Sequence, residues 1–255
     1  DHLLQIGVGR LPVKNREEAK RVTDKLIDYT SGSVRGKWRN RVTFVADNGD
    51  NNIHQQHADQ LAHLVTGKFL PSRVFIDEYP LTATSLGNRA PAVNKEIRRK
   101  VNDGSLILNF TGHGDESGWT DEKIFTLADM QALQGYENMP LFVTATCEFG
   151  RYDDPSVVSG AELLLLSARG AAIGAMTTTR PVFSSTNFSI NQAFYNAVNQ
   201  GITRLGDITR VTKNNSLAGA LNRNFVLLGD PSMKLAAPEL PVRWISAPDT
   251  LRASE

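Results

Sequence analysis

The sequence predicts an α/β fold with a mainly parallel β-sheet covered by helices on both faces. Strand-like and helix-like segments alternate almost throughout the 255 residues, which is typical of parallel strands joined by crossover helices. The segments 105–112 and 140–146 are apolar at successive positions, as strands buried on both faces require. A chain of this length has no difficulty in forming a hydrophobic core.

The first half of the chain contains three predicted helices and two predicted strands. The first helix, residues 17–29, follows Asn15, a favoured N-cap residue, and stops before Gly32. Its apolar face would hold Ala19, Val22, Leu26 and Ile27. After it we expect a strand at 41–46, a helix at 53–65, a strand at 72–79 and a helix at 90–103, which ends at Gly104.

The second half continues the alternation. After the strand at 105–112 we expect a helix at 127–133, a strand at 140–146, a helix at 157–168, a strand at 170–176, helices at 187–199 and 205–221, and a last strand within 224–235. Residues 1–237 would form the catalytic subdomain and 238–255 a linker or edge segment. The first residues have no leader-like pattern, so we interpret the chain as a piece of a longer protein.

Composition excludes several function classes. The 28 Lys and Arg residues nearly balance the 27 Asp and Glu residues, for a net charge of +1, and no basic stripe argues for a nucleic-acid partner. A single cysteine, Cys147, excludes an internal disulfide. No apolar run reaches the about 18 residues that a transmembrane helix needs.

Two reactive side chains follow two buried strands. His113 comes directly after the strand 105–112, and Cys147 directly after the strand 140–146, 34 positions later with one helical segment between them. Such a βαβ unit usually places its two strands side by side, about 4.8 Å apart. Both residues would therefore lie on the sheet edge where open α/β sheets bind ligands.

The pair suits nucleophilic catalysis. A thiol attacks as the thiolate, and a nearby imidazole can take its proton and later protonate a leaving amine. Gly112 and Gly114 would let a substrate backbone approach closely, and the N–H groups of Gly114 and Cys147 could donate to a developing oxyanion. A lone cysteine can also be a small buried apolar residue, and a Gly-His-Gly segment can be a simple turn; their placement together favours catalysis.

Other sites are not supported by the spacing. His54, His57 and His63 share one helical segment, but no carboxylate or cysteine completes a metal set with them, so the sequence predicts solvated or packing histidines. The segment DNGDNN, residues 47–52, has the oxygen-rich composition of a calcium loop. It is not an EF-hand, because Ala58 stands where that loop needs glutamate.

Two segments around the reactive residues resemble the gingipain family of cysteine peptidases: NFTGHGDESGW at 109–119 and PLFVTATCEFGRYDDP at 140–155. IGVGRLPV near the start and LLGDPSMKL near the end support the resemblance, which covers most of the chain. It implies a caspase-like α/β/α sandwich with His113 as the general base, Cys147 as the nucleophile, and Gly114 and Cys147 as the oxyanion donors. It requires no cofactor and allows structural calcium.

Within the family, the chain is similar to sortase-like signal peptidases of the bacterial type IX secretion system. This implies a location at the outer-membrane surface and the removal of a C-terminal signal domain from secreted cargo. The implied partners are that cargo, anionic lipopolysaccharide as acyl acceptor, and outer-membrane attachment-complex subunits. The alternatives are a broad-specificity surface cysteine protease and a non-catalytic, peptidase-like cargo-binding domain.

The resemblance also locates weaker site positions. The acidic residue that orients the histidine in arginine-specific relatives falls at or beside Asn48, with Asp47 next to it. The arginine-binding aspartate falls near His54, which would not hold a guanidinium. The expected substrate pocket contains His54, Thr179, Val182 and Phe183. These departures argue against trypsin-like arginine specificity.

Overall fold

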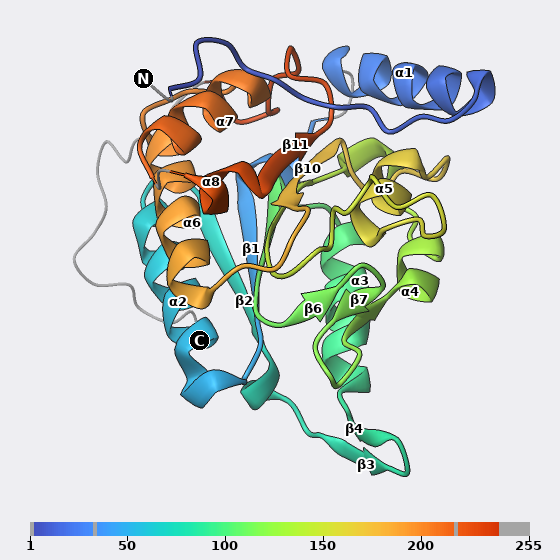
Figure 1. Cartoon of the computed structure of the whole chain (residues 1–255), viewed down its shortest axis with the longest axis vertical. Coiled ribbons are helices and arrows are strands. Elements are labelled where there is room, and N and C mark those ends of the chain that lie inside the picture. Colours follow the sequence, from blue (N-terminus) through green and yellow to red (C-terminus); the bar gives the residue numbers. More distant parts are fainter. Residues whose placement is uncertain (1–2, 33–34, 217–218, 240–255) are drawn as a thin grey trace, which may run out of the picture.

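The computed structural model describes residues 3–32, 35–216 and 219–239, and its centre is a six-stranded sheet (Figure 1). The strand order is β11-β10-β9-β5-β1-β2, and every neighbouring pair is parallel except β10 and β11. The predicted mainly parallel α/β sheet is therefore confirmed. The strands are β1 (Arg41–Ala46), β2 (Leu70–Phe75), β5 (Ile107–Thr111), β9 (Leu141–Ala145), β10 (Gly174–Thr178) and β11 (Phe225–Leu228).

Helices cover the sheet from both sides. The helices α2, α6 and α7 lie on one side, and α1, α3, α4 and α5 on the other (Figure 1). Their bounds are α1 (Arg16–Thr30), α2 (Ile53–Val65), α3 (Pro91–Asn102), α4 (Leu127–Gln131), α5 (Gly160–Leu166), α6 (Ser184–Asn199), α7 (Leu205–Asn214) and α8 (Ala220–Arg223). The short 3₁₀ helices are η1 (Lys37–Asn40), η2 (Asp50–Asn52), η3 (Ile76–Glu78) and η4 (Tyr136–Asn138). The α/β/α arrangement buries β1, β5 and β9 on both faces.

The first helix begins as predicted and buries Val22 and Leu26 as expected, but the buried face includes Lys25 and not Ile27. Asn15 caps α1, its side-chain oxygen accepting from the Glu18 N–H at 2.8 Å. Ile27, predicted on the buried face, is 60% exposed, whereas Lys25 is 1% exposed. The long lysine side chain reaches the Leu165 carbonyl next to the C-terminus of α5, and this contact selects the face that packs.

Several predicted elements differ from the observed ones; the helix predicted at 157–168, for example, spans only Gly160–Leu166. The strand predicted at 72–79 starts earlier, as β2, and becomes η3 at Ile76. The strand predicted at 170–176 begins only at Gly174, because Gly170 and Ala171 adopt positive φ angles of 103° and 86° and break the extended chain. The helix predicted at 205–221 ends at Asn214. The last strand spans four residues and is antiparallel.

Two small sheets were not predicted, because strands of two or three residues carry no readable alternation. One is the hairpin β3 (Thr82–Thr84) and β4 (Gly87–Arg89). The other follows His113 and contains β6 (Gly114–Asp115), β7 (Gly118–Trp119) and β8 (Phe125–Thr126). The fully buried Trp119 stacks on Phe110 of β5, with ring centroids 4.2 Å apart. This stacking anchors the second small sheet to the core directly beyond His113.

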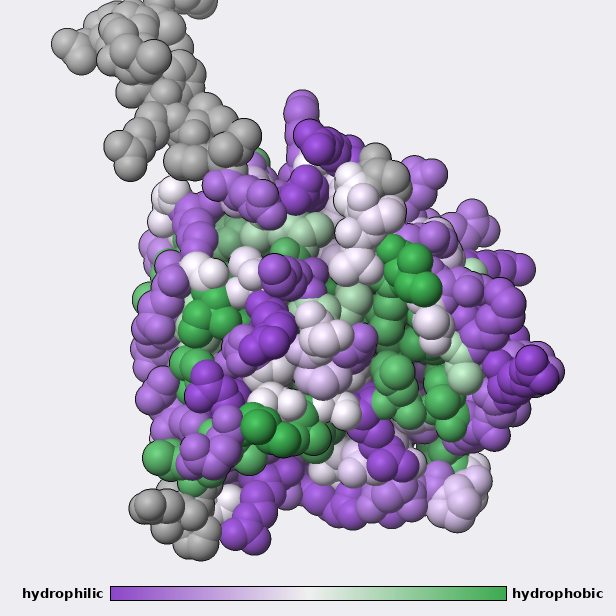
Figure 2. All heavy atoms as spheres, turned by 90° about the horizontal axis from the view of Figure 1, so that it is seen from above, coloured by the Kyte–Doolittle hydropathy of each residue, from purple (hydrophilic) through white to green (hydrophobic). Residues whose placement is uncertain are grey.

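The N-terminal segment, residues 3–15, runs across the top of the molecule in Figure 1. Arg10 is fixed beside β11 by backbone hydrogen bonds to Leu227 and Gly229. Ile6 and Val8 are 70% and 59% exposed, and Figure 2, which views the molecule from this side, shows apolar patches on the surface. Among the described helices, none has both the length and the apolar character to cross a membrane. The tail predicted at 238–255 lies outside the described residues from 240 onward, and the division at 237 stays a prediction.

Candidate active site

The strand register places His113 and Cys147 at the same edge of the sheet. The parallel strands β5 and β9 pair from Ile107 with Leu141 to Thr111 with Ala145. Each pair differs by 34 positions, and His113 and Cys147 lie two residues beyond the last pair. The predicted adjacency of the two strands and of their carboxyl ends is therefore confirmed.

The glycines around His113 have a reason within the protein. A Cβ on Gly112 would lie 2.3 Å from the Asp47 Cβ, and one on Gly114 would lie 2.6 Å from the Thr146 Oγ1. Side chains at either position would push the loop away from its neighbours. We expected these glycines to give room for a substrate backbone. The structure shows that they let the His113 loop approach the ends of β1 and β9; the approach of a substrate backbone and the role of the Gly114 N–H stay predictions.

Cys147 lies at a sharp turn of the chain. Its side chain is half-buried, with the Sγ atom 3.7 Å from the Val182 carbonyl oxygen. The next residue, Glu148, has a φ of 54°, in the left-handed region that non-glycine residues seldom adopt. Phe149 then enters the core fully buried, with its ring 5.6 Å from that of Trp119. The turn therefore leaves the thiol at the sheet edge while anchoring the chain on both sides of it.

An ion pair joins the loop of the thiol to the loop of the histidine. Arg151, four residues after Cys147, places its Nη1 2.8 Å from the Glu116 Oε1. The same nitrogen lies 3.6 Å from the Glu148 Oε1. Partly exposed pairs contribute little to stability, typically below about 1 kcal/mol. Their significance here is that they link the two loops that carry the reactive groups.

A carboxylate outside the predicted set contacts the imidazole. The His113 Nε2 lies 3.2 Å from the Asp50 Oδ2. Asp50, Asn51 and Asn52 have positive φ angles of 54°, 54° and 62°. Aspartate and asparagine are the side chains that tolerate this conformation best. The composition of DNGDNN was the available signal, but sequence alone could not show which of its carboxylates faces the ring.

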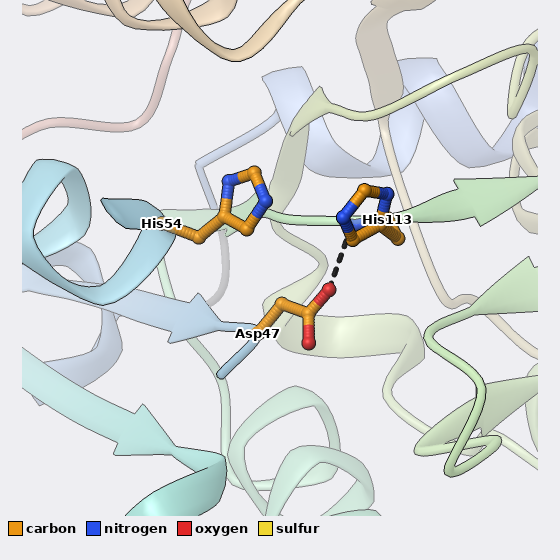
Figure 3. A group of neighbouring side chains, drawn as sticks. All are labelled: Asp47, His54 and His113. Carbon is orange, nitrogen blue, oxygen red and sulfur yellow. Dashed lines mark hydrogen bonds between the residues drawn. The ribbon is translucent and has the colours of Figure 1, made fainter. Parts of the chain in front are cut away.

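The two residues predicted to orient His113 lie elsewhere. Asp47 is buried, and its Oδ2 accepts from the backbone N–H of His113 at 2.9 Å, the contact drawn in Figure 3. Its Oδ1 accepts from the Gly49 N–H at 3.2 Å. The Asn48 amide donates to the Asp77 Oδ1 at 3.0 Å. Asp47 therefore fixes the backbone at His113, and the carboxylate within 3.2 Å of the ring belongs to Asp50.

His54 lies on the His113 side of the site (Figure 3). It is 3% exposed, and its ring centroid is 5.1 Å from that of His113, with the ring planes nearly perpendicular. Burial lowers the pKa of His54, while Asp47 and Asp50 oppose that shift. The ligand atoms of Asp47, His54 and His113 lie within 4.8 Å of one another. The sequence analysis looked for further ligands next to the histidines of the predicted helix at 53–65. It missed this group because Asp47 and Asp50 both precede α2.

The other predicted pocket residues lie on the thiol side. Val182 points its carbonyl at the Cys147 sulfur, and Phe183, before α6, is 68% exposed. The Thr179 hydroxyl donates to the Asn224 carbonyl at 3.3 Å. The structure thus places Val182 beside the thiol, whereas His54 belongs to the histidine side of the site.

A cavity of about 740 Å³ lies away from this site. Its lining includes Trp38, Lys68 and Tyr136, which precede β1, β2 and β9. It therefore opens at the edge where the parallel strands begin, while the reactive pair follows the strands at the other edge. This cavity is therefore not part of the candidate site.

Comparisons with known proteins place the chain in a family. The sequence profile described as Peptidase family C25 matches residues 1–236. Gingipain R2 of Porphyromonas gingivalis is 23% identical to the chain over 284 residues, which cover 100% of the chain and 36% of the relative. Gingipain R1 of the same organism is 26% identical over 203 residues, which cover 76% of the chain and 18% of the relative.

A solved structure extends the likeness to the fold. The crystal structure of the Arg-specific cysteine proteinase gingipain R superposes with a TM-score of 0.75 at 18% identity, covering 92% of this chain and 56% of that one. The expected caspase-like α/β/α fold is confirmed. The chain spans only about a third, or less, of the length of the curated relatives that it matches.

Proposed function

Because the chain belongs to peptidase family C25, we propose that it is a cysteine peptidase in which Cys147 is the nucleophile and His113 its general base. The observation that carries the proposal is the β5–β9 register, which brings the only thiol and this imidazole to one edge of the sheet. Two contacts support it: the Asp50 carboxylate lies 3.2 Å from the His113 Nε2, and the Arg151–Glu116 ion pair links the loop of the histidine to the loop of the thiol.

The reaction follows from these groups. His113 takes the proton of the thiol, and the sulfur forms a bond to the carbonyl carbon of the scissile peptide. The C–N bond then breaks, and the proton passes from His113 to the departing amine. The Gly114 and Cys147 N–H groups are the proposed donors to the oxyanion formed in between. The thioester that remains is resolved by water or by another amine, which regenerates the thiol.

Asp50 is the proposed orienting residue. A carboxylate near one imidazole nitrogen fixes the ring orientation and stabilises the imidazolium that forms when the thiol loses its proton. Asp50 meets the distance requirement at 3.2 Å, on a loop whose three left-handed residues set its direction. This replaces the earlier expectation for Asn48, whose amide faces Asp77.

The finer proposal is a sortase-like signal peptidase, similar to PorU of the type IX secretion system. It would remove the C-terminal signal domain of secreted cargo and pass the acyl group to water or to an amine of anionic lipopolysaccharide. The location would be the outer-membrane surface, next to attachment-complex subunits. One feature supports this over arginine-specific digestion: by the resemblance, the arginine-binding aspartate falls near His54, and a buried imidazole does not pair with a guanidinium.

The test uses the full-length protein and its Cys147→Ala variant, each mixed with a purified cargo that carries its C-terminal signal domain. Intact-mass spectrometry follows the cargo with and without a glycine peptide as acyl acceptor. Trimming with a peptide adduct by the wild type alone supports thiol-dependent acyl transfer. Trimming without an adduct supports a hydrolase, and cleavage of unrelated unfolded proteins supports a broad-specificity protease. Trimming by Cys147→Ala would refute the nucleophile, and no trimming by folded wild type would favour a cargo-binding domain.

A further inference from the structure

We infer that His54, His113, Asp47 and Asp50 form a binding site for a zinc-like divalent cation, and that a bound cation withdraws His113 from catalysis. The binding part stands on the geometry of these four side chains alone. The inhibitory part rests on the proposed peptidase function, since it assumes that His113 is the general base. The site is assembled from the loop after β1, the first turn of α2 and the loop after β5 (Figure 3).

The distances suit a metal centre. Zinc binds imidazole nitrogens and carboxylate oxygens at 2.0–2.2 Å, so tetrahedral ligand atoms lie about 3.3 Å apart. The Asp50 Oδ2 lies 3.4 Å from the His54 Nε2 and 3.2 Å from the His113 Nε2. The Asp50 Oδ2 is therefore at ligand-to-ligand distance from one nitrogen of each histidine. Asp47 adds an oxygen within 4.8 Å of a nitrogen on each histidine.

His54 gives an independent indication that a ligand belongs here. It is 3% exposed; its Nε2 lies 3.4 Å from the Asp50 Oδ2 without the geometry of a hydrogen bond, and its Nδ1 has no hydrogen-bond partner within the described part of the chain. A buried polar group without such a partner is costly, by about 1 to 3 kcal/mol. The ring points toward His113 rather than into the apolar core (Figure 3). A cation would satisfy the nitrogen that the protein leaves without a hydrogen bond.

Asp47 is held in place for such a role. Its two oxygens accept from the backbone N–H groups of His113 and Gly49, in the way that outer hydrogen bonds usually orient a ligating carboxylate. A carboxylate has about four lone-pair positions, so these two bonds leave capacity for a metal. Its burial, at 4% exposure, keeps the oxygen next to the two imidazoles.

The ligand types identify the class of cation. Two imidazoles with carboxylates suit zinc and neighbouring transition metals, whereas calcium and magnesium prefer sets made of oxygen alone. The ring edge of His113 is exposed, so a cation can enter from solvent. Once bound, it occupies the Nε2 atom and fixes the charge of the ring. The imidazole can then no longer shuttle the thiol proton, and peptide cleavage stops until the metal is removed.

The test measures zinc binding separately from catalysis. The parent is the full-length protein carrying Cys147→Ala, which removes the thiol as an alternative zinc ligand. Isothermal titration calorimetry with Zn²⁺ is run on this parent and on versions that also carry His54→Ala, Asp50→Asn or His63→Ala. His63 is the matched control, because it lies on the same helix as His54 and is exposed. Calcium is titrated as the control cation.

We expect one zinc per chain in the parent and the His63→Ala variant, and at least about ten-fold weaker binding in the His54→Ala and Asp50→Asn variants. Asp50→Asn is nearly isosteric and guards against misfolding of the His54 variant. In the wild type, zinc should abolish cleavage and a chelator should restore it. Equal affinity in the parent and the two ligand variants, loss of binding in His63→Ala, or binding that needs the Cys147 thiol would overturn the site. Zinc binding without any peptidase activity would retain the site and refute only the catalytic proposal.

Discussion

Lys25 should make this protein more stable as the pH rises above about 7. The side chain is 1% exposed, and burial lowers its pKa from 10.5 to about 7. No carboxylate pairs with it among the described residues; its Nζ donates to the carbonyls of Leu165 and Ser167. We predict that the change Lys25→Met removes a rise in the free energy of unfolding that the wild type shows between about pH 7 and about pH 9.

The magnitude follows from proton linkage. Below about pH 7, Lys25 is charged in both the folded and the unfolded states, and the penalty for burying the charge is fully present. Between that pH and 10.5 only the unfolded state keeps the proton, so stability rises with pH by at most about 1.4 kcal/mol per unit. From about pH 7 to about pH 9, the Lys25 contribution should therefore increase by about 2 kcal/mol.

Urea unfolding followed by tryptophan fluorescence measures this difference. The free energy of unfolding is compared between wild type and Lys25→Met at each pH, so that contributions of all other groups cancel. Lys20→Met is the matched control, because Lys20 lies on the same helix with its side chain 74% exposed. We expect the wild-type-minus-variant difference to rise with pH for Lys25 and to stay flat for Lys20. A flat difference for Lys25 would show that its folded-state pKa is not lowered and would refute the reasoning.

Three further predictions concern the site and its support. Asp50→Asn should lower kcat at least about ten-fold with little change in KM, and Asn48→Ala should cost less; the reverse order in steady-state kinetics would contradict the orienting role of Asp50. Gly112→Ala should destabilise by about 1 to 3 kcal/mol more than Gly67→Ala, where φ is also positive but no atom lies within 4 Å; equal urea midpoints would contradict the close approach. Trp119→Ala should cost about 3 to 5 kcal/mol of unfolding free energy, and a loss below about 1 kcal/mol would mean that the small sheet is not anchored by this ring.

The sequence predicts the central sheet well where burial is two-sided. The strands β1, β5 and β9 start and end within two residues of their expected bounds, because continuous apolar runs between turn residues leave little choice. Antiparallel pairing of β11 was not predictable, since a four-residue strand does not reveal its direction. The exposure of Ile27 and the burial of Lys25 depend on α5, which is distant in sequence.

The candidate site also has features that the sequence predicts and features that it does not. The adjacency of His113 and Cys147 could be predicted because a single βαβ crossover fixes which strands are neighbours and which ends align. The contacts of Asp50 could not be, because they depend on three consecutive left-handed residues that direct its carboxylate toward the ring. Neither could the orientation of His54, a buried histidine whose partners come from other elements.

His54 connects the two proposals made for this site. By the resemblance, arginine-specific relatives have an aspartate near this position, and a carboxylate there attracts a cationic side chain. An imidazole does not attract a cationic side chain in this way. Next to His113 and Asp50, the His54 ring provides a metal ligand instead. One residue would thus remove arginine specificity and add sensitivity to zinc. The change His54→Asp replaces an imidazole nitrogen by carboxylate oxygens, so it should lower the preference of the site for zinc over calcium while improving cleavage after arginine relative to other residues. A variant with unchanged cation preference and unchanged specificity would contradict both proposals and leave the role of His54 to packing.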